Sequence, residues 1–153
     1  MKFLVREAVA DDVPTIAPLL DAYRVFYGQT ANPYAAKLFL SERFKRSDSK
    51  IFLAIDADSQ QSVGFVQLFA TYSSVKLGRI YIVEDLYVRE DARRSGIASA
   101  LLRAAALFAK ASSAVGLTLQ TARSNERAQA LYAKHGFAVD NEFLTYNKVL
   151  DKS

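Results

Sequence analysis

The segment from Arg93 to Ala98 combines two arginines and a glycine at the expected junction between a strand and a helix. The first N–H groups of a helix lack partners within the helix, and the helix dipole adds partial positive charge there. Gly96 allows the backbone to approach a ligand closely, and the arginines supply fixed charge. A plain strand-to-helix connection is the alternative, and the paired arginines weigh against it. The turn is therefore a candidate site for a phosphate-bearing ligand.

Two carboxylates, Glu84 and Asp85, interrupt the apolar strand expected just before this turn. Side chains alternate along a strand, so one of the two must face away from solvent unless a bulge intervenes. Desolvation raises the pKa of a carboxylate on an apolar face toward the range useful for a general base. Glu84 is the candidate base, and Asp85 is a candidate contact for a substrate amine. The structural alternative is a carboxylate that accepts from nearby backbone or pairs with an arginine.

Hydrophobic periodicity and turn residues predict the elements that position these groups. A helix that starts at an N-cap residue, Asp11, is expected to run to about Phe26. In chain order, the remaining patterns predict strands over 2–8, 51–55, 63–69, 77–88, 115–120 and 143–150, and helices over 35–44, 96–110 and 125–134. A helix connects the strand at 80–88 to the strand at 115–120, which favours a parallel pair. We expect an α/β fold in αβα layers, in which helices cover both faces of a mixed, mostly antiparallel sheet.

Composition bounds the function. The chain has 153 residues, 51% of them apolar, as expected for one ordinary domain over 1–153. Its net charge of +4 suits an anionic ligand. The charge is too dispersed for a nucleic-acid binder. There is no cysteine and a single histidine, His135, so thiol catalysis is excluded and a histidine-based metal site is not expected. No signal peptide or membrane span is evident, and a cytoplasmic protein is the default.

The motifs together resemble a known family. The strand is followed by Arg-x-x-Gly-x-Ala over 93–98, then by Asn125-x-x-Ala128-x-x-x-Tyr132, and then by Gly136-Phe137. This order is similar to that of the GNAT superfamily of acetyl-CoA-dependent N-acetyltransferases, and the motifs span about 80–137. The Glu-Asp-Leu-Tyr-Val segment also resembles the equivalent strand of diamine acetyltransferases, in which the matching glutamate acts as base through water.

The resemblance implies roles for particular residues. Glu84 and Tyr132 would be catalytic, with Tyr132 donating a proton to the departing sulfur of coenzyme A. The residues implied in binding acetyl-CoA are Leu86, Tyr87, Val88, Arg93, Arg94, Ser95, Gly96, Ile97, Ala98, Ser99, Asn125 and Ala128. Asn125 is also a candidate N-cap. N–H groups near Leu86 and Val88 would hold the oxyanion, if the strand splays from its parallel neighbour.

The acceptor is expected to be a small molecule with a primary amine, such as a polyamine or an amino-acid-like compound. Asp85, Tyr27 and Tyr72 are the candidate contacts, since carboxylates and aromatic faces suit an ammonium group. Direct transfer in a ternary complex is expected without a metal, and the resemblance implies a homodimer. A protein N-terminal or lysine acetyltransferase and a non-catalytic acyl-CoA-binding regulator are the alternatives.

Overall fold

The computed structural model describes residues 1–151, and the chain divides into two compact units, Met1–Gln120 and Thr121–Ser153. The first unit contains, in order, β1 (Phe3–Glu7), α1 (Val13–Phe26), α2 (Pro33–Arg46), β2 (Lys50–Asp56), β3 (Ser62–Ser73), β4 (Gly78–Val88), α3 (Ile97–Ala111) and β5 (Gly116–Leu119). Short 3-10 turns precede α1 at Ala10–Asp12 (η1) and follow β4 at Glu90–Ala92 (η2). The second unit contains α4 (Glu126–Lys134).

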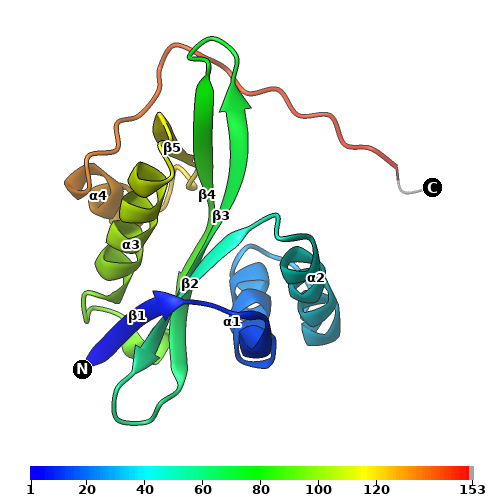
Figure 1. Cartoon of the computed structure of the whole chain (residues 1–153), viewed down its shortest axis with the longest axis vertical. Coiled ribbons are helices and arrows are strands. Elements are labelled where there is room, and N and C mark those ends of the chain that lie inside the picture. The colour runs from blue at the N-terminus through cyan, green and yellow to red at the C-terminus, as the bar shows by residue number, and fades with distance from the viewer. Residues whose placement is uncertain (152–153) are drawn as a thin grey trace. The chain divides into compact units, whose positions relative to one another are not determined.

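The five strands form one sheet in the order β1-β2-β3-β4-β5. Neighbouring strands are antiparallel except β4 and β5, which are parallel as the helical connection between them predicts. Helices α1 and α2 cover one face of this sheet, and α3 covers the other (Figure 1). The predicted α/β fold with a mixed, mostly antiparallel sheet is therefore confirmed.

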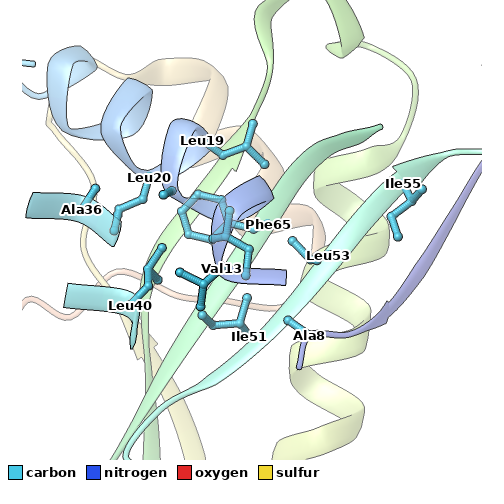
Figure 2. Close-up of a cluster of buried hydrophobic side chains, with 12 residues drawn as sticks. Ala8, Val13, Leu19, Leu20, Ala36, Leu40, Ile51, Leu53, Ile55 and Phe65 are labelled. Carbon is cyan, nitrogen blue, oxygen red and sulfur yellow. The ribbon is translucent and has the colours of Figure 1, made fainter. Parts of the chain in front are cut away.

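One hydrophobic core lies between the sheet and the pair α1 and α2 (Figure 2). Phe65 of β3, Ile16 of α1 and Leu40 of α2 are completely buried there. The apolar residues of α1 recur at helical spacing, so they form one stripe that faces the sheet. On the opposite face, Ile97 and Leu101 of α3 are buried against the strands. This packing holds β3 and β4 between two layers of helices.

The start of α1 differs from its prediction by one residue. Asp12, rather than Asp11, stands immediately before the helix. Its carboxylate accepts hydrogen bonds from Arg6 at 2.8 Å and from the Val9 N–H at 2.7 Å. Asp12 is the acidic residue that can reach both groups across η1, so it joins the turn to β1.

The strand predicted over 143–150 is wrong. Residues 137–151 contain no helix or strand, and the side chains of Phe143, Tyr146 and Val149 are exposed. The alternation that favours a strand does not supply a neighbour, and a strand forms only where its backbone groups find hydrogen-bond partners. None of the helices in the described part of the chain is long and apolar enough to span a membrane.

The packing of α3 over the sheet leaves little room for a side chain at Gly64, so a substitution there should lower stability. A Cβ added there would lie 2.9 Å from the Tyr87 carbonyl oxygen and 3.4 Å from side-chain atoms of Ile97 and Leu101. Gly64→Ala should therefore lower the free energy of unfolding by about 1–3 kcal/mol through overpacking. Urea denaturation provides the measurement. The matched control is Gly116→Ala, where an added Cβ meets nothing within 4 Å; equal effects of both changes would contradict the prediction.

Candidate functional site

The second half of β4 has a strand on only one side. The parallel ladder with β5 ends where Val83 lies beside Leu119. On the other side, β3 continues along β4 as far as the pair of Gly64 with Val88. Within the described residues, the stretch Glu84–Val88 therefore has an open edge that faces away from β3.

The direction of the backbone groups on this stretch follows from two hydrogen bonds. The Arg89 N–H points toward β3 and donates to the Val63 carbonyl at 2.7 Å. Backbone N–H and C=O groups reverse direction from one residue of a strand to the next, so those of Val88 and Leu86 point away from β3. The Val88 carbonyl accepts from Arg93 Nε at 2.9 Å, which agrees with this direction. The N–H groups of Leu86 and Val88 thus lie on the open edge, where a chain that carries amide groups could pair with them.

A bulge interrupts the pairing of β3 and β4 at the start of the open edge. Gln67 lies opposite Asp85, but the next residue of β3, Leu68, lies opposite Val83. Glu84 is therefore the extra residue of a β-bulge, without a partner of its own on β3. The bulge gives the two carboxylates different environments: Glu84 is exposed and Asp85 is buried.

Asp85 is the carboxylate whose ionisation the protein alters. Its side chain is 7% exposed and accepts a hydrogen bond from Gln67 Nε2 at 2.5 Å. Burial raises the pKa of Asp85 to about 6; the Gln67 hydrogen bond lowers this pKa, and the charge of neighbouring Glu84 raises it. Strand alternation predicts only that one of the two carboxylates leaves solvent unless a bulge intervenes; the structure contains the bulge and buries Asp85.

The turn after β4 brings backbone groups to the start of α3. Gly96 has φ +81° and Arg94 has φ +64°, both in the left-handed region. At Gly96 an added Cβ would meet nothing within 4 Å, so this position requires glycine for its backbone conformation rather than for space. The Ala100 N–H donates to the Gly96 carbonyl at 3.1 Å, which makes Gly96 the N-cap of α3. The other predicted contacts, Ser95, Ile97, Ala98 and Ser99, complete the turn and the first turn of the helix.

The Arg93 side chain does not extend from this turn. Its Nε donates to the Val88 carbonyl, and its guanidinium carbon lies 5.6 Å from the centre of the Tyr87 ring. Arg93 therefore packs along the end of β4. Both arginines are exposed, but Arg93 is held against β4 by these contacts, so Arg94 is the one placed to supply charge to an anion at the start of α3.

Two further predicted residues fall at different distances from Asp85. Tyr27 follows α1, is 47% exposed, and packs edge-on against Tyr23, whose hydroxyl donates to the Glu84 carbonyl at 3.0 Å. Tyr72 lies opposite Arg79, five residues along β3 from Gln67, which corresponds to about 17 Å. The structure thus connects Tyr27 to the open edge and separates Tyr72 from it.

An open groove of about 750 Å³ lies next to the end of β4. Its lining residues are Pro18, Asp21, Ala22, Val25, Phe26, Pro33, Tyr87, Glu90 and Arg93. Of these residues, the sequence analysis predicts only Tyr87 and Arg93 as site residues. The spacing of Pro18, Asp21, Ala22 and Val25 along α1 is helical, but the same spacing describes the neighbouring core stripe, so it gives no separate signal.

The second unit contains the remaining predicted residues. Asn125 caps α4, and its side-chain oxygen accepts from the Ala128 N–H at 3.1 Å, as expected for an N-cap. Tyr132 lies on α4 with its ring 6.0 Å from that of Phe137. Gly136 has φ +86° just after the helix, in the left-handed conformation that commonly ends a helix. No cluster of three or more potential metal-binding side chains occurs among residues 1–151.

The altered ionisation of Asp85 predicts a pH-dependent stability. Between about pH 4 and pH 6 the unfolded chain loses this proton while the folded protein keeps it, so the free energy of unfolding falls as pH rises. A pKa of about 6 against 3.8 corresponds to roughly 3 kcal/mol. Asp85→Asn lacks this contribution and should gain about that much stability relative to wild type between pH 4 and pH 7.

Urea unfolding of both proteins across this pH range measures the difference. Asp11→Asn, which changes an exposed carboxylate, is the control. Parallel stability curves for wild type and Asp85→Asn would show that the folded protein does not hold the proton on Asp85.

Comparison with known proteins identifies the family. The model of the acetyltransferase (GNAT) family matches residues 16–137. An uncharacterised N-acetyltransferase YhfO of Bacillus subtilis is 39% identical over 142 residues, which cover 93% of this chain and 94% of that protein. A probable acetyltransferase of Haemophilus influenzae is 37% identical over 97 residues, 63% of this chain and 66% of that protein.

Solved structures agree with the sequence relatives. A crystal structure of a probable acetyltransferase is 35% identical, covers all of both chains and superposes with a TM-score of 0.89. A ribosomal-protein-alanine N-acetyltransferase from Brucella melitensis has the same fold at 23% identity, with a TM-score of 0.81 over 97% of this chain and all of that one. The chain belongs to the GNAT family and is an acetyltransferase.

Proposed function

We propose that this protein transfers the acetyl group of acetyl-CoA to a primary amine of a small molecule, such as a polyamine or an amino-acid-like compound. The observation that carries the proposal is the open edge of β4 at Glu84–Val88, which leads directly into the left-handed turn at the start of α3. Backbone donors thus follow one another from the exposed carboxylate of Glu84 to a helix N-terminus, as a long donor with amide and phosphate groups requires.

The donor side combines the edge and the turn. The N–H groups of Leu86 and Val88 would pair with the amide-bearing arm of coenzyme A and stabilise the oxyanion that develops on the thioester carbonyl. The backbone of Arg94–Ser99, together with the charge of Arg94, would hold the pyrophosphate. Ala128, the small residue on α4, and Asn125, which caps that helix, would contact the same cosubstrate.

The proposed chemistry needs one base and one acid. An alkyl ammonium group has a pKa of about 10, so it must lose a proton before it can attack. Glu84, exposed at the bulge, would take this proton directly or through water. The amine nitrogen then forms a bond to the carbonyl carbon, the carbon–sulfur bond breaks, and the hydroxyl of Tyr132 protonates the departing thiolate. No cysteine is present to carry the acetyl group, which supports direct transfer in a ternary complex.

The acceptor would enter from the side of α1. Asp85 and Tyr87 project from the same face of β4, and Tyr87 lines the groove, so the groove lies on the face of β4 that carries Asp85. Tyr27 lies beside Tyr23 at the same end of α1 and would contact the acceptor. Tyr72, about 17 Å along β3, would reach only a long acceptor. As for many members of the family, we propose that the working form is a cytoplasmic homodimer.

Two other functions remain as alternatives. Solved structures with this fold include an aminoglycoside acetyltransferase and a ribosomal-protein-alanine N-acetyltransferase, at 14% and 23% identity, so the fold accommodates both small and protein acceptors. The second alternative is a regulator that binds acyl-CoA without turnover. The presence of both Glu84 and Tyr132 favours catalysis over that role.

An acceptor panel separates these possibilities. The protein is incubated with acetyl-CoA and, in turn, with polyamines, amino acids, a lysine analogue and peptides with free N-termini, while thiol release is followed. We expect release with small primary amines. Release with peptides alone would establish the protein acetyltransferase instead. Binding of coenzyme A without turnover on any acceptor would establish the regulator.

The proposed acid makes a separate prediction. Tyr132→Phe removes only the phenolic hydroxyl and should lower kcat on the order of 100-fold, because the thiolate then leaves without a positioned proton donor. Affinity for coenzyme A, measured by direct titration, should change little. Tyr146→Phe is the matched control, since Tyr146 is an exposed tyrosine of the same unit. An unchanged kcat, with chemistry shown to limit the rate, would remove Tyr132 from the mechanism.

A further inference from the structure

We infer that Gln67 of β3 is a positioning residue, which holds the Asp85 carboxylate charged and oriented toward the acceptor amine. This inference rests on the proposed function, because it assumes that Asp85 contacts the acceptor. Nothing in the sequence motifs singles out Gln67, which lies in the middle of an apolar strand, Val63–Phe69.

The geometry ties the two side chains to each other. Gln67 and Asp85 are directly opposite across β3 and β4, and their side chains lie on the same face of the sheet. Gln67 Nε2 donates a hydrogen bond to Asp85 Oδ2 across a distance of 2.5 Å. Gln67 is the one hydrogen-bond partner of the Asp85 carboxylate among residues 1–151, so a single contact sets its direction.

Packing does not explain a glutamine at this position. Gln67 is completely buried, and its Oε1 atom has no hydrogen-bond partner in the described structure. A buried amide that uses only part of its hydrogen-bonding capacity costs stability compared with an apolar residue of similar size. Phe65, two residues away on the same face of β3, is apolar and completely buried, as packing in the core favours. The donor on Nε2 is therefore the property of Gln67 that the site uses.

The location of the pair connects it to the reaction. The Gln67–Asp85 pair is the last one before the bulge, at the point where β5 leaves β4. Two residues further along β4, on the same face as Asp85, Tyr87 lines the groove. Asp85 thus lies at the start of the edge along which the thioester would lie, on the face of β4 whose Tyr87 lines the groove from which the acceptor would enter.

The surrounding groups explain why the carboxylate needs this donor. Glu84 adjoins Asp85 on β4 and adds a like charge, while burial removes water from Asp85. From α1, Tyr23 donates its hydroxyl to the Glu84 carbonyl, and on β4 Tyr87 presents an aromatic ring. The Gln67 amide is thus the group that favours the charged form of Asp85. Without it Asp85 would hold its proton to higher pH, and a neutral carboxylic acid would attract an ammonium group weakly.

Gln67→Met tests the inference, because it keeps the volume of the side chain and removes the donor. We expect the acidic limb of the kcat/KM profile for the amine to move upward by about one pH unit. At pH 6 the KM for the amine should rise several-fold while kcat changes less, because the charged fraction of Asp85 falls from about a half to about a tenth. Gln67→Glu, which places a second carboxyl group opposite Asp85, should move the limb in the same direction. Leu68→Met, a change at the adjacent buried residue on the other face, is the control for packing.

A second readout does not depend on turnover. The 13C resonance of the Asp85 carboxyl group reports its titration in wild type and in both Gln67 variants. Matching upward shifts of this titration and of the acidic limb support the inference. A shifted titration with an unmoved limb, or no shift of the titration in folded Gln67→Met, overturns it. Absence of turnover with every amine, while the titration still shifts, instead overturns the proposed function and with it the role of the pair in acceptor binding.

Discussion

The end of the pairing between β4 and β5, at Val83 and Leu119, is the constraint on which the site depends. An open strand edge presents unpaired backbone groups, which are costly unless other groups satisfy them. Two side chains satisfy carbonyl groups of this edge: the Tyr23 hydroxyl donates to the Glu84 carbonyl, and Arg93 Nε donates to the Val88 carbonyl. With these acceptors occupied, the edge offers mainly N–H donors. Such an edge suits a ligand rich in carbonyl groups, and it suits a carbonyl that becomes an oxyanion even better.

The bulge at Glu84 gives two adjacent carboxylates different environments. In a regular strand one extra residue would exchange the faces of every side chain beyond it. Here the shift leaves Glu84 in solvent and places Asp85 beside Gln67 inside the sheet. A charged, accessible group and a buried, hydrogen-bonded group are thereby available within one residue of each other. Proton transfer and amine binding can then be assigned to different carboxylates.

Local sequence signals predicted some parts of this structure, and only tertiary contacts determine the others. The turn at Gly96 and the cap at Asn125 depend on a few adjacent residues, so both could be read from the sequence. The bulge could not, because it results from the register between β3 and β4. The expected strand at 143–150 failed for the same reason, since an alternating pattern does not specify a pairing partner. The sequence does not predict the groove, because its lining combines residues of α1, the end of β4 and η2, which are far apart along the chain.

The positive net charge of the chain argues against a cationic acceptor only if charge acts at long range. Solvent screens charges beyond about 8–10 Å, so the groups near the reacting amine matter more than the total of +4. Four carboxylates, Glu84, Asp85, Glu90 and Asp91, occur on β4 and the turn after it, and Asp91 is paired with Arg89. Against them, Arg93 lines the groove, while Arg24 is paired with Asp21. Recognition of an ammonium group at this end of β4 is therefore compatible with a basic protein.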